Sequence, residues 1–136
     1  MRIANYQFDE LLTKVNESDD IVLELKNTLN VPYVRQYLET QISETWPKFD
    51  VDSEKLEKST YHRSMAGAFL LSRPVYTVFD QILMSQALPD ELQLKRLKNL
   101  YPMLCAGEAD ILIALLEKNI SAIYPNITYE VLNEAL

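Results

Sequence analysis

Glycine, histidine and cysteine are scarce in this sequence. The chain of 136 residues holds two glycines, one histidine and one cysteine. Two isolated glycines cannot build a phosphate-binding loop, and they are too few for a β-rich fold with many tight turns. His62 and Cys105 alone cannot supply the paired ligands of a zinc site. We therefore expect neither a cofactor nor a metal, and we predict no catalytic residues.

The sequence also has fewer basic than acidic residues and no long apolar run. Its formal net charge is −7, and an acidic chain is repelled by nucleic-acid phosphates and by anionic lipid surfaces. No apolar run approaches the roughly 20 residues of a membrane span, and residues 1–6 hold no apolar signal core. A lone cysteine forms no internal disulfide. These features predict a cytoplasmic protein with no direct nucleic-acid binding and no membrane contact.

Apolar residues are abundant, at 48% of the chain, and many recur at helical spacing. The richest segment lies between Gly107 and Asn119, where Glu108 and Asp110 are expected to open a helix. Its apolar positions make a face too wide for a surface helix, so we predict that it is the most buried element. These positions are Ile111, Leu112, Ile113, Leu115 and Leu116. A helix before it, starting at Pro89, would complete a helical hairpin.

Shorter amphipathic helices are predicted along the rest of the chain. Asn5, Ser18 and Thr128 are the expected N-caps of three of them. A helical pattern also covers residues 53–72, and another follows Pro74. Residues 46–52 are expected to be irregular, because Pro47 disfavours helical backbone at Trp46. The sequence predicts one all-α, bundle-like domain of seven to eight short helices over residues 1–136.

The C-terminal third carries a characteristic order of features. An apolar helix is followed by the Glu108-Ala109 pair, then Tyr124, a short Ile127-Thr128 turn and a closing Glu134-Ala135 pair. In this order it resembles a family of small proteins from large contractile-tailed bacteriophages, notably those that infect cyanobacteria. That family has an extended Trp-Pro-Tyr region, of which Trp46-Pro47 remains here. The resemblance implies a phage origin and the host cytoplasm, and it carries over no activity or functional residue.

Charged and reactive side chains give little sign of chemistry. Cys105 stands in an apolar context and is interpreted as a small buried hydrophobe. Neighbouring acids such as Asp50 and Asp52 do not have the spacing of a calcium loop. The basic residues Lys95, Arg96 and Lys98 are expected to pair with acids along or between helices.

Aromatic residues are the remaining signal, with 8 Tyr, 4 Phe and 1 Trp. Such side chains are effective at protein interfaces. We predict that Trp46 and Phe49, with Tyr37 and Tyr61 nearby, face a partner. The alternative is that this loop folds inward and anchors the core.

The resulting hypothesis is a non-enzymatic phage protein that acts as a protein–protein interaction module. Its partner would be a phage or host protein, and self-association through an aromatic face stays open. One alternative is an anti-defence or host-takeover inhibitor, including an acidic mimic of nucleic acid. A second alternative is an enzyme without a recognisable motif.

Overall fold

Seven α-helices and two short 3-10 helices make up the regular structure of the described residues. The structure is a computed structural model and describes residues 7–45, 56, 67–84 and 91–136. Within them it has no β-strand, so the all-α prediction is confirmed. The elements are α1 (Phe8–Asn16), α2 (Ile21–Thr28), α3 (Val34–Ile42), α4 (Arg73–Met84), α5 (Glu91–Leu100), η3 (Tyr101–Met103), α6 (Ala106–Leu116), η4 (Ile120–Ala122) and α7 (Tyr129–Ala135).

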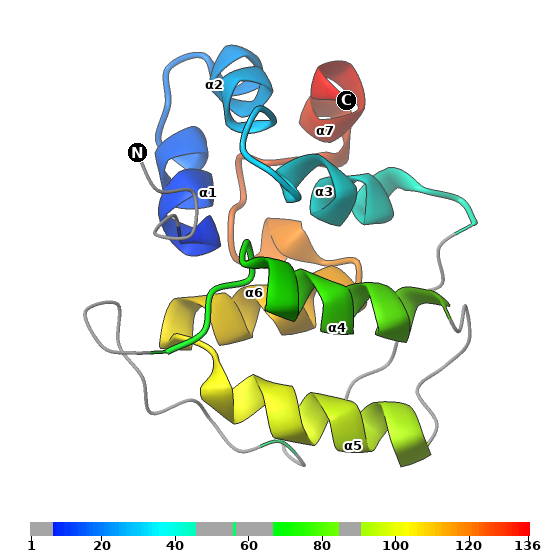
Figure 1. Cartoon of the computed structure of the whole chain (residues 1–136). Coiled ribbons are helices and arrows are strands. Elements are labelled where there is room, and N and C mark those ends of the chain that lie inside the picture. Colours follow the sequence, from blue (N-terminus) through cyan, green and yellow to red (C-terminus); the bar gives the residue numbers. More distant parts are fainter. Residues whose placement is uncertain (1–6, 46–55, 57–66, 85–90) are drawn as a thin grey trace.

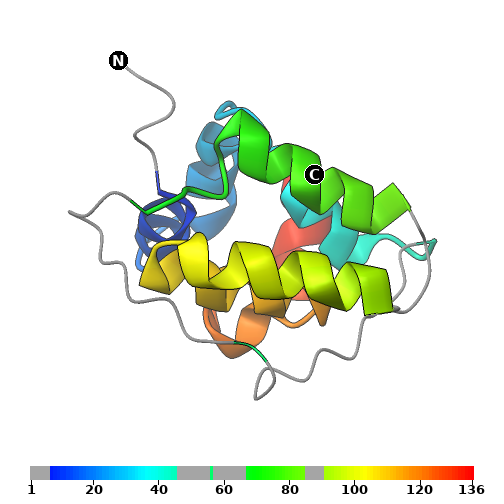
Figure 2. The same ribbon diagram turned by 60° about the horizontal axis from the view of Figure 1, so that its bottom comes forward.

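The helices form two groups that meet at α6. Helices α1, α2, α3 and α7 lie together in the upper part of Figure 1, and α4, α5 and α6 lie in the lower part. Helices α4 and α5 run side by side in both views (Figures 1 and 2). Helix α6 packs against α1 and α3 of the upper group. It is therefore the element through which the two groups share one apolar core.

Helix α6 is buried on nearly all sides, as its apolar pattern predicts. Every residue from 111 to 116 is buried. The helix begins at Ala106 rather than at Glu108, so the predicted start is two residues late. Gly107 lies inside the first turn, where the carboxylate of Asp9 approaches its backbone. A Cβ atom built on Gly107 would overlap with Asp9 Oδ2, which explains why glycine fits a helical position here.

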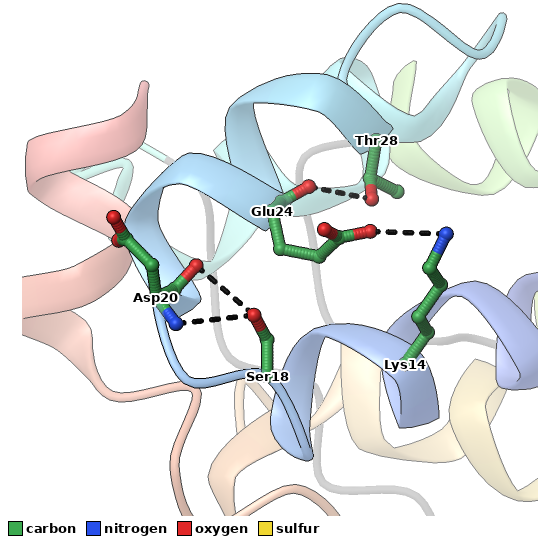
Figure 3. A network of polar contacts seen from close by, with 5 residues as sticks. All are labelled: Lys14, Ser18, Asp20, Glu24 and Thr28. Carbon is green, nitrogen blue, oxygen red and sulfur yellow. Dashed lines mark hydrogen bonds and ion pairs between the residues drawn. The ribbon is translucent and has the colours of Figure 1, made fainter.

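The corner between α1 and α2 is held by a small polar network (Figure 3). Asp20, not Ser18, caps α2: its side chain accepts a hydrogen bond from the backbone N–H of Leu23 at 3.2 Å. Ser18 instead accepts from the backbone N–H of Asp20 at 3.2 Å. Lys14 Nζ of α1 lies 3.3 Å from Glu24 Oε1 of α2. The predicted cap at Ser18 is therefore wrong by two residues: Ser18 contacts the backbone of the true cap, Asp20.

The predicted cap of the last helix is confirmed. Thr128 Oγ1 accepts a hydrogen bond from the backbone N–H of Val131 at 3.3 Å. The expected cap at Asn5 lies outside the described residues.

Residues 67–72 are not helical, and here the sequence pattern is misleading. The backbone N–H of Ala68 donates to the carbonyl of Met103 at 2.8 Å, and Cys105 N–H donates to the carbonyl of Ala68 at 3.1 Å. These bonds form an isolated parallel bridge between Ala68 and Leu104. Ala68 is kept out of a helix because it pairs with the connection between η3 and α6, and residues 70–72 form a turn and a bend. Most of the predicted helix over residues 53–66 lies outside the described residues.

Candidate functional site

The structure does not bring the four predicted partner-facing residues together on a described surface. Trp46, Phe49 and Tyr61 lie outside the described residues. Tyr37 is fully buried, and its ring packs against Phe8 and Phe79 with centroid distances of 5.3 and 4.5 Å. Its hydroxyl donates to the carbonyl of Leu70 at 2.6 Å. The prediction for Tyr37 is corrected: it is a core residue, because the helix face that carries it turns inward.

The most unusual side chain in the core is the fully buried carboxylate of Glu108. It accepts hydrogen bonds from the backbone N–H of Phe8, at the first residue of α1, and from the backbone N–H of Leu70. Phe8 N–H is one of the donors that a helix start leaves without an intrahelical acceptor. The N-cap residue of α1, Gln7, makes no side-chain capping bond. Glu108 therefore caps α1 from a different helix and fixes the turn at Leu70 as well.

Other polar groups surround Glu108. Asp9, which is also buried, lies beside it on α1, and Gln7 Nε2 lies 3.8 Å from Cys105 Sγ. Burial raises the pKa of Glu108 to about 7, against the effect of the Leu70 and Phe8 N–H groups and together with the charge of Asp9. Burial, then the charges of Glu108 and Asp9, raise the pKa of the Cys105 thiol. The predicted burial of Cys105 is confirmed, and its thiol stays protonated at neutral pH.

The backbone engages both carboxylate oxygens of Glu108, which accept from the N–H groups of Phe8 and Leu70. Within the described ranges, no three His, Cys, Asp or Glu side chains gather as a metal site would require. Sequence reasoning missed this residue because its partners lie 100 and 38 positions away along the chain.

A hollow on the surface offers a different kind of site. It lies along α6 where η3 and η4 border the helix, and its volume is about 390 Å³. We call it the α6 hollow. Its apolar lining comes from Ile113, Ala114, Ala122 and Ile123, and its polar lining comes from Tyr101, Asp110, Glu117 and Asn119.

The end of α6 places two of these polar residues at the rim. Lys118 adopts a left-handed conformation with φ 55°, and its N–H donates to the carbonyl of Leu115 at 3.1 Å. The N–H of Asn119 donates to the carbonyl of Ala114 at 2.8 Å. This pair of bonds is the Schellman motif that closes many helices. It turns the chain sharply, so that Glu117 and Asn119 border the same hollow as residues from the middle of α6.

A second, smaller hollow of about 260 Å³ lies between α4 and α5. Its described lining is mainly apolar, and Met103 at its edge is 58% exposed. Arg96 also lines it. The expected pairing of Lys95, Arg96 and Lys98 with acids is not seen within the described residues, where the ion pairs Lys14–Glu24 and Arg35–Glu39 involve none of the three.

Comparisons with protein-family models, with curated proteins and with solved structures found no match for this chain. Among the helices that the structure describes, none combines the length and apolar character needed to cross a membrane.

Proposed function

We propose that this protein is a non-enzymatic phage protein that binds a phage or host protein in the host cytoplasm. The observation that supports this proposal best is the α6 hollow. Ile123 is 39% exposed at its edge and continues the apolar lining onto the surface. Single exposed apolar residues are common, but an exposed residue that borders a hollow gives a partner both area and shape to bind.

The alternatives have less support from the described residues. A nucleic-acid mimic needs rows of carboxylates, whereas the acids at the α6 hollow stand among apolar side chains. An enzyme needs a reactive group that a substrate can reach, whereas the oxygens of Glu108 are engaged by backbone donors. An interaction module needs neither feature.

The proposal is tested by co-purification with three forms of the tagged protein from the cells that produce it. The forms are the wild type, Ile123→Asp and the control Leu23→Asp, since Leu23 is 56% exposed on α2 and does not line the hollow. We expect one stoichiometric protein partner with the wild type and the control, and its loss with Ile123→Asp at an unchanged melting temperature. The absence of any stoichiometric partner, or its retention by all three forms, would contradict the proposal for this site.

The Trp46–Phe49 loop stays a separate prediction. Trp46→Ala and Phe49→Ala are expected to weaken partner binding and keep the melting temperature if the loop faces a partner. A loss of about 3–5 kcal/mol of stability, typical of a truncated buried aromatic, would instead identify the loop as an anchor in the core.

A further inference from the structure

We propose that the α6 hollow receives an arginine or lysine side chain from a basic segment of the protein partner. This inference rests on the proposed function and adds the chemistry of the partner. Arginine and lysine have a long aliphatic stem and a charged end, and they bury the stem while the charge stays near water or an anion. The α6 hollow offers apolar walls for the stem and carboxylates for the charge.

The first argument is charge. Asp110 and Glu117 are seven positions apart along α6 and its C-cap, which is about 10 Å along a helix axis. Both line the hollow, and neither is in an ion pair with any described residue. A cationic side chain between them would supply a counter-charge that the described residues do not supply through an ion pair. The net charge of −7 adds a long-range attraction for a basic partner.

The second argument is the hydroxyl of Tyr101. The side chain is only 5% exposed and lines the hollow, yet its hydroxyl has no hydrogen-bond partner among the described residues. Burial and then the charge of Asp110 raise the pKa of Tyr101, which places the hydroxyl in the field of that carboxylate. A phenol oxygen accepts hydrogen bonds from guanidinium and ammonium groups.

The third argument is size. A volume of about 390 Å³ is near the lower end of the range of about 300–1,000 Å³ for ligand sites. A hollow of this size can hold one long side chain with its immediate neighbours, whereas a folded domain needs a much larger surface.

The test is a titration of the isotope-labelled protein followed by NMR. The probe is the capped tripeptide Leu-Arg-Leu, and the matched control peptide is Leu-Gln-Leu. We expect the arginine peptide to bind at least about threefold more tightly, as for an exposed ion pair, and to shift the amide signals of residues 110–119 and 122–123. This preference should decrease as salt is raised.

Two variants locate the effect. Asp110→Asn combined with Glu117→Gln should remove the preference for the arginine peptide. Asp80→Asn combined with Glu130→Gln is the control, because it changes the net charge equally at exposed positions of α4 and α7. Tyr101→Phe should weaken binding of the arginine peptide about two- to tenfold while the melting temperature is kept.

Equal binding of the two peptides, or shifts away from the hollow, would overturn the inference. So would self-association of the wild type that the Asp110→Asn/Glu117→Gln variant abolishes, because a second copy would then be the occupant. If the natural partner is lost with Ile123→Asp but kept by the charge variant, the proposed function stands and this inference falls.

Discussion

At Glu108, burial and hydrogen bonding act on one carboxyl group in opposite directions. Burial dominates and raises its pKa from 4.5 to about 7. Between these values the folded state binds more protons than the unfolded state, so the free energy of unfolding decreases as pH rises from about 4.5 to about 7. Above the folded pKa this contribution is constant. The neighbouring ionisable groups are Asp9, Tyr37 and Cys105.

We predict that the wild type loses about 2–3 kcal/mol more stability than Glu108→Gln between pH 5 and pH 8. The amide does not titrate, so the difference between the two proteins isolates this group from all others. Urea unfolding at several pH values measures it. Parallel pH dependences of the two proteins would show that Glu108 keeps an ordinary pKa.

Gly107 gives a second prediction at the scale of one residue. Alanine normally stabilises a helix relative to glycine by up to about 1 kcal/mol. Here the new methyl group would meet Asp9, so we expect Gly107→Ala to lower stability by about 1–3 kcal/mol, as overpacking does. In an Asp9→Ala background the same change should cost less. Equal costs in both backgrounds, measured by urea unfolding, would show that the approach of Asp9 does not require glycine.

Helix α6 is the element with the largest share of buried positions, and the side chain of Leu112 on this helix is fully buried. We expect Leu112→Ala to cost about 2–5 kcal/mol, because it removes buried methyl groups and leaves a cavity. Leu23→Ala on the exposed side of α2 is the matched control and should change stability by less than about 0.5 kcal/mol. Thermal unfolding of both variants measures the difference. Similar melting temperatures for the two would show that α6 is not the centre of the core.

The elements also show what the sequence can and cannot predict. Apolar spacing identified α6, and the Thr128 cap was readable because it depends on neighbours three positions away. Residues 67–72 were misread as helical, since the backbone pairing of Ala68 depends on Met103 and Cys105, which local patterns cannot reveal. Glu108 looked like a helix-opening acid for the same reason. At the α6 hollow, the spacing of Asp110 and Glu117 was visible, but the positions of Tyr101 and Ile123 beside them required the fold.

At the scale of the whole molecule, hydrogen bonds connect the C-terminal segment to the first helix, α1. Tyr124 donates from its hydroxyl to the carbonyl of Asp9 at 3.2 Å. Asn126 bonds to Asn16 through its backbone N–H and its side-chain amide, each at 2.9 Å. Helix α7 packs on α2 and α3. These contacts make the two ends of the described chain one structural unit.

We therefore predict that a chain ending at Asn119 loses cooperative unfolding. It would keep α6 but lose the buried residues Ile120, Tyr124, Ile127 and Leu132, and α2 and α3 would expose the surface that α7 covers. Circular dichroism during heating measures the effect against the full chain. A sharp transition at the full-length melting temperature would mean that the C-terminal segment is an addition to the fold rather than a part of it.

The cap that Glu108 provides for α1 also has a consequence for biosynthesis. The two residues are separated by 100 positions, and ribosomes add about 5–20 residues per second. Helix α1 is therefore made about 5–20 seconds before the carboxylate that completes its first turn. During that time α1 can pack against α2 and Tyr37, but it still lacks its contacts with α6. The native first turn of α1 thus forms only after Glu108 has been synthesised, and until then the apolar face of α1 can be bound by chaperones that recognise exposed apolar segments.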